Sequence, residues 1–372
     1  MQTIDNEITL DEEDLADIIR GSTVLGCGGG GSPKNGWRLI KKELKKGKEF
    51  KLISINKIPN HKRTVSVYFV GPINGDRKYR NLAAEALIEL ESFLNEEFFA
   101  IIPTEMGGNS TAVALSTAAR LGIPTVDGDM AGRAVPELHH SVYYLHGHKM
   151  TPFSVVTLHG DVMIVPKIKD DINAEKLVRS IVSSIKSKVG VASHPIKGKI
   201  SKEILIRDSL SYALKLGKIL REKDDWILKF LKEGGFLLFK GECIFLKWKN
   251  ENGFTVGEVE LQGIDEFKGE SYRIWFKNEN IISWRNNQID VTVPDLITIL
   301  TIEGEPVINS ELKAGREYVV FGFKAPKVWR SPKGLKILGP RHFGFNVKYI
   351  PIEKRKIKAQ RLTHHSRMSV QL

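Results

Sequence analysis

Three carboxylates stand directly behind short apolar runs, where burial would suit them to proton transfer. Glu105 follows the apolar run 99–102, and Asp127 and Asp129 follow the run 123–126. A place between a buried strand and a Gly-Gly turn would desolvate Glu105, so we expect a raised pKa and a role as general acid or base. The sequence therefore predicts acid–base chemistry in this part of the chain.

The residues between the two runs predict the elements that position these carboxylates. Apolar residues recur at helical spacing over 110–121, with Asn109 or Ser110 as a cap and a glycine as the stop. The result is a unit of strand, turn, helix and strand, in which the two strands are usually parallel. Ligands bind at the carboxyl ends of such strands, so the carboxylates should converge on the turn at Gly107 and Gly108.

A second candidate for ligand binding is a run of four glycines before another predicted helix. Such a run cannot form a stable helix or strand interior, and it allows several backbone N–H groups to point into one concavity. Ser32 and Pro33 suit the start of the following helix, which makes anion binding the functional interpretation. The run matches neither G-x-G-x-x-G nor a P-loop, and a flexible turn is the alternative. The glycines are Gly28, Gly29, Gly30 and Gly31.

The pattern of elements predicts an α/β N-terminal domain with a glycine-rich ligand site, joined to a largely β C-terminal domain. We expect the first domain over residues 1–165, where the apolar run 142–145 is among the predicted strands. The second, over 166–352, begins with helices and changes after Gly235 to short strand-like runs separated by turns. Residues 353–372 are polar and basic and predict a loose tail.

Composition limits the class of protein. The chain has 372 residues, of which 41% are hydrophobic and 27% charged, as in ordinary globular proteins. The chain has two cysteines, which is too few for a disulfide framework. It shows neither a signal peptide nor 18 consecutive apolar residues, so we expect a cytoplasmic protein without membrane contact. The net charge of +12 raises nucleic acid as a partner, but no aromatic residues accompany the basic runs, and a lysine-rich solvated surface is favoured.

Seven separated blocks, in order, resemble the S-methyl thiohydantoin desulfurase family, which includes members encoded next to or fused with hydantoinases. The resemblance covers about residues 11–352. It implies an α/β domain followed by a β domain, with the ligand in the glycine-rich and acidic loops of the first. The blocks are LGCGGGGSP (25–33), EMGGNS (105–110), VDGDMAGRAVPE (126–137), SLSYALKLGKIL (209–220), FKNENII (276–282), PDLITIL (294–300) and GPRHFGFNVKYIP (339–351).

The resemblance implies removal of the methylthio group from an S-methyl thiohydantoin, which leaves a hydantoin. Water would add to the ring carbon that bears sulfur, and methanethiol would leave with a proton. In this reaction Glu105 would be the general acid or base, and Asp127 and Asp129 would orient the water. Arg133 would face the ring carbonyl or a substrate carboxylate.

Backbone groups of the two glycine segments would bind the substrate and the negative charge that develops on it. These expected substrate-binding residues are Gly28, Gly29, Gly30, Gly31, Gly107, Gly108 and Asn109.

A divalent metal such as zinc is a separate hypothesis, with Asp127, Asp129 and Glu137 as the expected ligands. Histidines cluster shortly downstream, but they follow no H-E-x-x-H or comparable spacing, and surface or packing roles are favoured for His139 and His140. The clustered histidines are His139, His140, His146, His148 and His159.

Two functions of different classes remain open at this point. The first is a hydrolase-like enzyme that acts on a small hydantoin-type ring. The second is a non-catalytic ligand-binding or accessory subunit that works with a hydantoinase. Under either function we expect the protein to bind a small molecule, and either function is compatible with a homo-oligomer.

Overall fold

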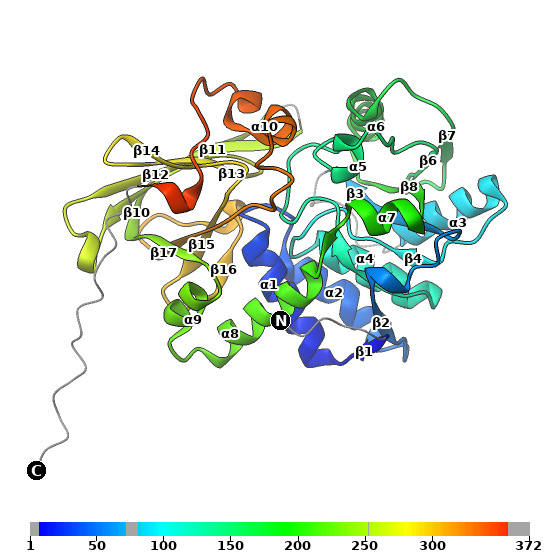
Figure 1. Cartoon of the computed structure of the whole chain (residues 1–372), viewed down its shortest axis with the longest axis horizontal. Helices are drawn as coiled ribbons and strands as arrows, with labels where there is room; N and C mark the ends of the chain where they lie inside the picture. The colour runs from blue at the N-terminus through cyan, green and yellow to red at the C-terminus, as the bar shows by residue number, and fades with distance from the viewer. Residues whose placement is uncertain (1–6, 72–80, 252, 356–372) are drawn as a thin grey trace, which may run out of the picture.

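The computed structural model describes residues 7–71, 81–251 and 253–355, and it contains two sheets that stand side by side (Figure 1). The expected loose tail lies outside the described residues, apart from its first three positions. No helix in the described ranges is long and apolar enough to cross a bilayer.

The first sheet is mixed and, among the described residues, has nine strands in the order β1-β2-β5-β4-β3-β8-β6-β7, with β9 paired to β5. Strands β2, β5, β4 and β3 run parallel to one another. The pair β4 and β5, which come from the apolar runs 99–102 and 123–126, was predicted to be parallel, and this is confirmed. The bounds are β1 (Ile8–Leu10), β2 (Phe50–Ser54), β3 (Arg63–Val70), β4 (Ala100–Ile101), β5 (Thr125–Asp129), β6 (Phe153–Val156), β7 (Val162–Val165), β8 (Val189–Lys197) and β9 (Ile206–Arg207).

The helices pack mainly around this first sheet and at its junction with the second (Figure 1). Two of them begin or end at predicted residues, since Pro33 opens α2 and Asn109 and Gly122 flank α4, while the Asp11 side chain caps α1. The bounds are α1 (Glu12–Leu25), α2 (Pro33–Leu44), α3 (Leu82–Leu94), α4 (Ser110–Leu121), α5 (Val142–Leu145), α6 (Asp171–Ile185), α7 (Gly198–Ile204), α8 (Ser209–Glu222), α9 (Trp226–Lys232) and α10 (Pro332–Leu338).

The second sheet is antiparallel throughout and has the order β14-β13-β12-β11-β10-β17-β15-β16 in the described residues. The predicted two-domain organisation, α/β and then β, is thereby confirmed. The bounds are β10 (Phe236–Glu251), β11 (Phe254–Gly263), β12 (Ser271–Lys277), β13 (Glu279–Arg285), β14 (Gln288–Thr292), β15 (Leu296–Thr301), β16 (Pro306–Val307) and β17 (Glu317–Phe323).

Two features differ from the sequence-based expectation. Residues 142–145 form the helical turn α5 and not a strand, because the Ser141 hydroxyl accepts a hydrogen bond from the Tyr144 N–H and caps that turn. The region after residue 165, expected to begin with helices, also contains the strand β8, which lies between β3 and β6 in the first sheet. Short apolar runs do not distinguish a buried strand from a buried turn.

The helices α1 and α8 cross with their backbones almost in contact, which brings α8 against the first domain. A Cβ atom on Gly217 would lie 1.9 Å from the Asp17 carbonyl oxygen, and one on Gly21 would lie 1.8 Å from the Ala213 carbonyl oxygen. Both glycines have ordinary helical φ, so the constraint is the space between the helices. The same apolar core continues from α1 into β15 and β17 of the second sheet.

We therefore expect Gly217→Ala to lower the free energy of unfolding by about 2–3 kcal/mol, because one methyl group must force the two helices apart. Lys218→Ala is the matched control: it changes the neighbouring position of α8, whose exposed ammonium pairs with Asp14, and should change stability by less than about 0.5 kcal/mol. Urea unfolding of the two variants measures the difference. Equal effects would show that the helix crossing tolerates a side chain.

Candidate functional site

Glu105 lies in the loop between β4 and α4, at the carboxyl end of a parallel strand, as predicted. Its Oε1 accepts a 2.6 Å hydrogen bond from the Ser110 hydroxyl, and its Oε2 accepts a 2.8 Å hydrogen bond from the Val135 N–H. Burial raises the pKa of Glu105 to about 7, despite these two hydrogen bonds, and the charge of Asp129 adds to the rise. A carboxyl with this pKa can take up and release a proton at neutral pH.

A second buried carboxyl, Glu279 at the start of β13, approaches from the other domain. Its side chain is 3% exposed, and its Oε2 has no hydrogen-bond partner among the described residues. Burial raises the pKa of Glu279 well above its ordinary value, and the charge of Glu105 raises it further. Two carboxyls that share an interdomain site therefore favour protonated forms, a common arrangement in acid–base sites.

The four-glycine run packs against the backbone of the second glycine segment. A Cβ on Gly30 would lie 2.5 Å from the Gly107 Cα, and a Cβ on Gly29 would lie 1.9 Å from Glu279 Oε1. Gly30 also contributes a backbone hydrogen bond to Glu279. The carboxyl group of Glu279 thus lies beside the glycine run, where the sequence predicted a bound anionic ligand. Gly31, Gly108 and Asn109 share this interface, where Asn109 N–H and Ser110 N–H donate to the Gly30 carbonyl, whereas Gly28 packs against the Asn309 side chain and accepts from its N–H.

Asp127 and Asp129 are both buried at the end of β5, and their oxygens hold backbone segments. Asp127 Oδ1 accepts from the N–H groups of Leu210 and Ser211, which caps α8. Asp129 Oδ2 accepts from the N–H groups of Ala131 and Gly132, and its Oδ1 accepts from the Ser209 hydroxyl. Burial raises the pKa of both carboxyls, to about 6 for Asp129. Both carboxyls thus hold backbone groups, and neither belongs to the group of possible metal ligands around Glu137.

Arg133 is fully buried, and its guanidinium donates to backbone carbonyls. Its Nη1 donates to the Pro294 and Asp295 oxygens at 3.1 and 3.2 Å, and its Nη2 donates to the Asn280 oxygen at 3.2 Å. All three acceptors belong to the second domain. Arg133 therefore joins the domains and lies near the two glutamates, where its charge lowers the pKa of each.

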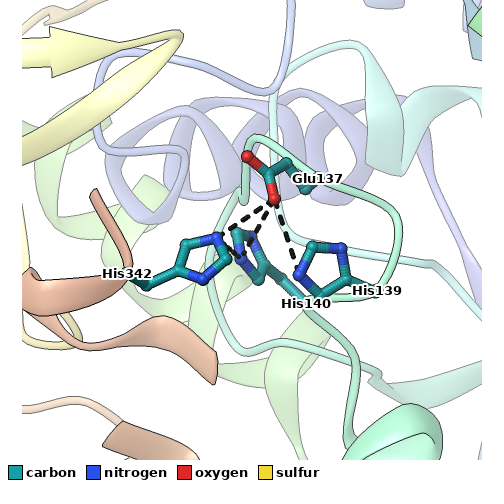
Figure 2. A group of neighbouring side chains, drawn as sticks. All are labelled: Glu137, His139, His140 and His342. Atoms are coloured by element: carbon teal, nitrogen blue, oxygen red, sulfur yellow. Dashed lines mark hydrogen bonds and ion pairs between the residues drawn. The ribbon is translucent and has the colours of Figure 1, made fainter. Parts of the chain in front are cut away.

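Glu137 has three histidines around one of its oxygens, a group we call the Glu137–histidine cluster (Figure 2). His139 and His140 follow it in the loop before α5, while His342 comes from the 3-10 turn Pro340–Phe343 after α10. One ligand atom from each residue lies within 4.8 Å of the others. Of the three ligands expected from the sequence, only Glu137 joins this group. His146 Nδ1 contacts the Val142 carbonyl, and His159 is exposed outside the cluster.

Two members of the cluster are buried, whereas Glu137 is half-buried and His342 is exposed. His139 and His140 are 5% and 1% exposed. Burial alone would raise the pKa of Glu137, but the His342 hydrogen bond and the Lys277 ammonium, which contacts Oε1, hold it well below the ordinary value. Burial keeps the pKa of His140 well below its usual range, so this ring is neutral at pH 7.

Glu279 and His342 are the residues that sequence reasoning did not single out. Both lie inside blocks quoted for the family resemblance, FKNENII and GPRHFGFNVKYIP, and this was the available signal. Their partners Glu105 and Glu137 are 174 and 205 positions away in the chain, so spacing could not pair them.

Family models account for both domains of the chain. The S-Me-THD-like, N-terminal domain matches residues 13–167, and the S-Me-THD-like, C-terminal domain matches residues 169–352. The chain belongs to the S-methyl thiohydantoin desulfurase family. The pair Glu105 and Glu279 and the Glu137–histidine cluster each combine residues of the two matched domains of this S-Me-THD-like protein.

The fold recurs in a solved structure. A protein from Chromobacterium violaceum, known from an X-ray crystal structure, superposes with a TM-score of 0.78 at 22% sequence identity, over 93% of this chain and 100% of the other. At this identity the match shows the S-Me-THD-like fold alone. No curated protein matches the chain.

The raised pKa values predict how stability depends on pH. A carboxyl whose pKa rises on folding binds more protons in the native state, so the free energy of unfolding falls as pH rises above the unfolded value of 4.5. We expect Glu279→Gln, which cannot ionise, to stabilise the protein at pH 8 relative to wild type by on the order of 1 kcal/mol and to flatten the decline between pH 5 and 8.

Urea unfolding at a series of pH values tests this prediction, with Glu242→Gln as the control at an exposed carboxyl of β10. An unchanged pH dependence in Glu279→Gln would show that Glu279 is ionised in the native state.

Proposed function

We propose that this S-Me-THD-like protein is an enzyme that removes the methylthio group from an S-methyl thiohydantoin by hydrolysis. The observation that carries the proposal is the pair of half-buried Glu105 and buried Glu279, at a junction between two domains that both match the family. Hydrolysis at an amidine-like carbon needs a base to activate water and an acid to protonate the leaving group. One carboxyl with a pKa of about 7 can do both in turn.

The reaction proceeds in two steps. Ionised Glu105 takes a proton from water while the water oxygen bonds to the ring carbon that bears sulfur, and electrons move to the ring nitrogen. The carbon–sulfur bond then breaks as the remaining hydroxyl proton passes to the ring nitrogen and a carbonyl forms, and the proton on Glu105 passes to the departing sulfur to give methanethiol. Protonated Glu279, whose Oε2 is unpartnered among the described residues, donates a hydrogen bond to charge that develops on the ring.

A ligand-binding or accessory subunit that works with a hydantoinase is the second candidate. It is favoured by the structural engagement of Asp127, Asp129 and Arg133, whose polar atoms hold backbone groups. Such a subunit would bind the ring beside the same glycine segments without turnover.

We expect Glu105→Gln to lower kcat for methanethiol release from an S-methyl thiohydantoin by at least about a hundredfold, with KM changed little, because general acid–base catalysis contributes about 10²–10⁴-fold. Glu91→Gln is the matched control, since Glu91 also accepts a backbone N–H, from Phe98 at 2.8 Å, but lies on α3 away from the site. Wild-type protein that binds the ring without turnover would support the accessory-subunit alternative.

The pKa of Glu105 also sets the pH profile of the reaction. Because the ionised form of Glu105 takes the proton from water in the first step, kcat/KM should rise with pH and level off above about pH 7. The profile is measured by methanethiol release between pH 5 and 9. A decline through pH 7 would instead assign Glu105 as a general acid in the first step.

A further inference from the structure

We propose that Glu137, His139, His140 and His342 bind one divalent transition-metal ion, Zn²⁺ foremost, which clamps the second domain onto the first. The proposal goes beyond the reaction proposed above, because metal binding at this cluster does not require that the protein turn over a thiohydantoin. Three imidazoles and one carboxylate form a donor set that suits zinc.

Four of the six distances between the donor atoms are close to those expected around a tetrahedral ion. Zn²⁺ bonds nitrogen and oxygen at about 2.0–2.1 Å, which places tetrahedral ligand atoms about 3.3 Å from one another. The Glu137 Oε2 atom lies 3.1, 3.5 and 3.8 Å from the Nε2 atoms of His342, His139 and His140. The Nε2 atoms of His140 and His342 are 3.2 Å apart. These four separations surround the expected value.

A second observation is that the rings are buried without full hydrogen bonding. The Nδ1 atoms of His139 and His140 have no hydrogen-bond partner in the described part of the chain, although both residues are more than nine-tenths buried. Their other nitrogens all face Glu137 Oε2 or the His342 ring (Figure 2). Each neutral imidazole has one N–H and one lone pair, and Nε2 lone pairs that converge on one carboxylate oxygen repel it unless a cation lies between them.

The surroundings hold the donors in place. The Lys277 ammonium contacts Oε1 of Glu137 and leaves Oε2 toward the three rings. Glu175 Oε2 lies 3.8 Å from His139 Nδ1 and is fixed by the Leu138 N–H at 2.9 Å, so a carboxylate stands behind one ligand ring. Outer carboxylates of this kind orient metal-binding histidines.

The ion would act as a structural link. Four protein donors complete a tetrahedron and leave no position for a water molecule, as in structural zinc sites. His342 follows α10 in the C-terminal part of the chain, whereas the other three donors lie in the loop between β5 and α5. Binding would therefore add a constraint between segments 200 residues apart to the apolar core they share.

The test uses the full-length protein, stripped with chelator and then titrated with ZnCl₂ in calorimetry, with bound zinc counted by mass spectrometry after desalting. We expect one tight ion per chain in wild type and a loss of affinity of at least about a hundredfold in His342→Ala, because removal of a ligand costs more than removal of an outer partner. His159→Ala, an exposed histidine outside the cluster, should bind as wild type does.

Cobalt substitution gives an independent readout. Co²⁺ at this site should show the visible absorption of a tetrahedral ion in wild type and in His159→Ala, and this band should be absent in His140→Gln. His140→Gln serves as the second variant because it keeps most of the ring's volume, and far-ultraviolet circular dichroism checks that it folds. Zinc should raise Tm in wild type but not in His342→Ala.

Absence of a tight ion in wild type, or equal zinc affinity in wild type and His342→Ala, would overturn the proposal. Neither result depends on turnover, so failure here and failure of the thiohydantoin reaction are separate outcomes.

Discussion

The burial of Glu105 and Glu279 at one domain junction is the constraint on which the rest of the site depends. Two carboxyls removed from water favour their protonated forms and destabilise the native state once ionised, so the surrounding fold must supply the free energy to hold them there. That free energy comes from the continuous apolar core and from close backbone contacts at glycines, such as Gly30 against Gly107. The glycine run lets one domain approach the other until Glu279 reaches the turn beside Glu105.

The polar residues that sequence reasoning placed in catalysis supply much of this support. Asp127 caps α8, Asp129 closes the turn after β5, and Arg133 donates to carbonyls of the second domain. A buried carboxylate that accepts backbone N–H groups and a reactive carboxylate have the same sequence signature, namely an acid directly after a buried strand. What separates them is the number of hydrogen bonds that each carboxyl accepts, two at Glu105 against three at Asp127 and three at Asp129, and several of those partners lie 80 or more positions away.

The sequence predicted the fold better than the site, for a physical reason. Residues such as Pro33 and Gly122 determine helix ends within a few positions of themselves, so the ends they predict are confirmed by the structure. The turn α5 was missed because its cap is a single serine hydroxyl beside an apolar run. The strand β8 and the donor His342 were missed because their partners are set by the three-dimensional fold. Neither Glu279 nor His342 has a local pattern that pairs it with Glu105 or Glu137.

One segment, residues 133–140, connects the two groups at the junction. Arg133 fixes its start to the second domain, the Val135 N–H donates to Glu105 two positions later, and Glu137 begins the histidine cluster. A matching segment on the other side carries Lys277 and Glu279, one for each group. A restraint at the cluster, whether the His342 hydrogen bond or a bound cation, therefore acts on the same backbone that donates to Glu105. Because that N–H stabilises the ionised carboxylate, the position of the segment contributes to how readily Glu105 holds its proton, beside burial and the Ser110 hydrogen bond.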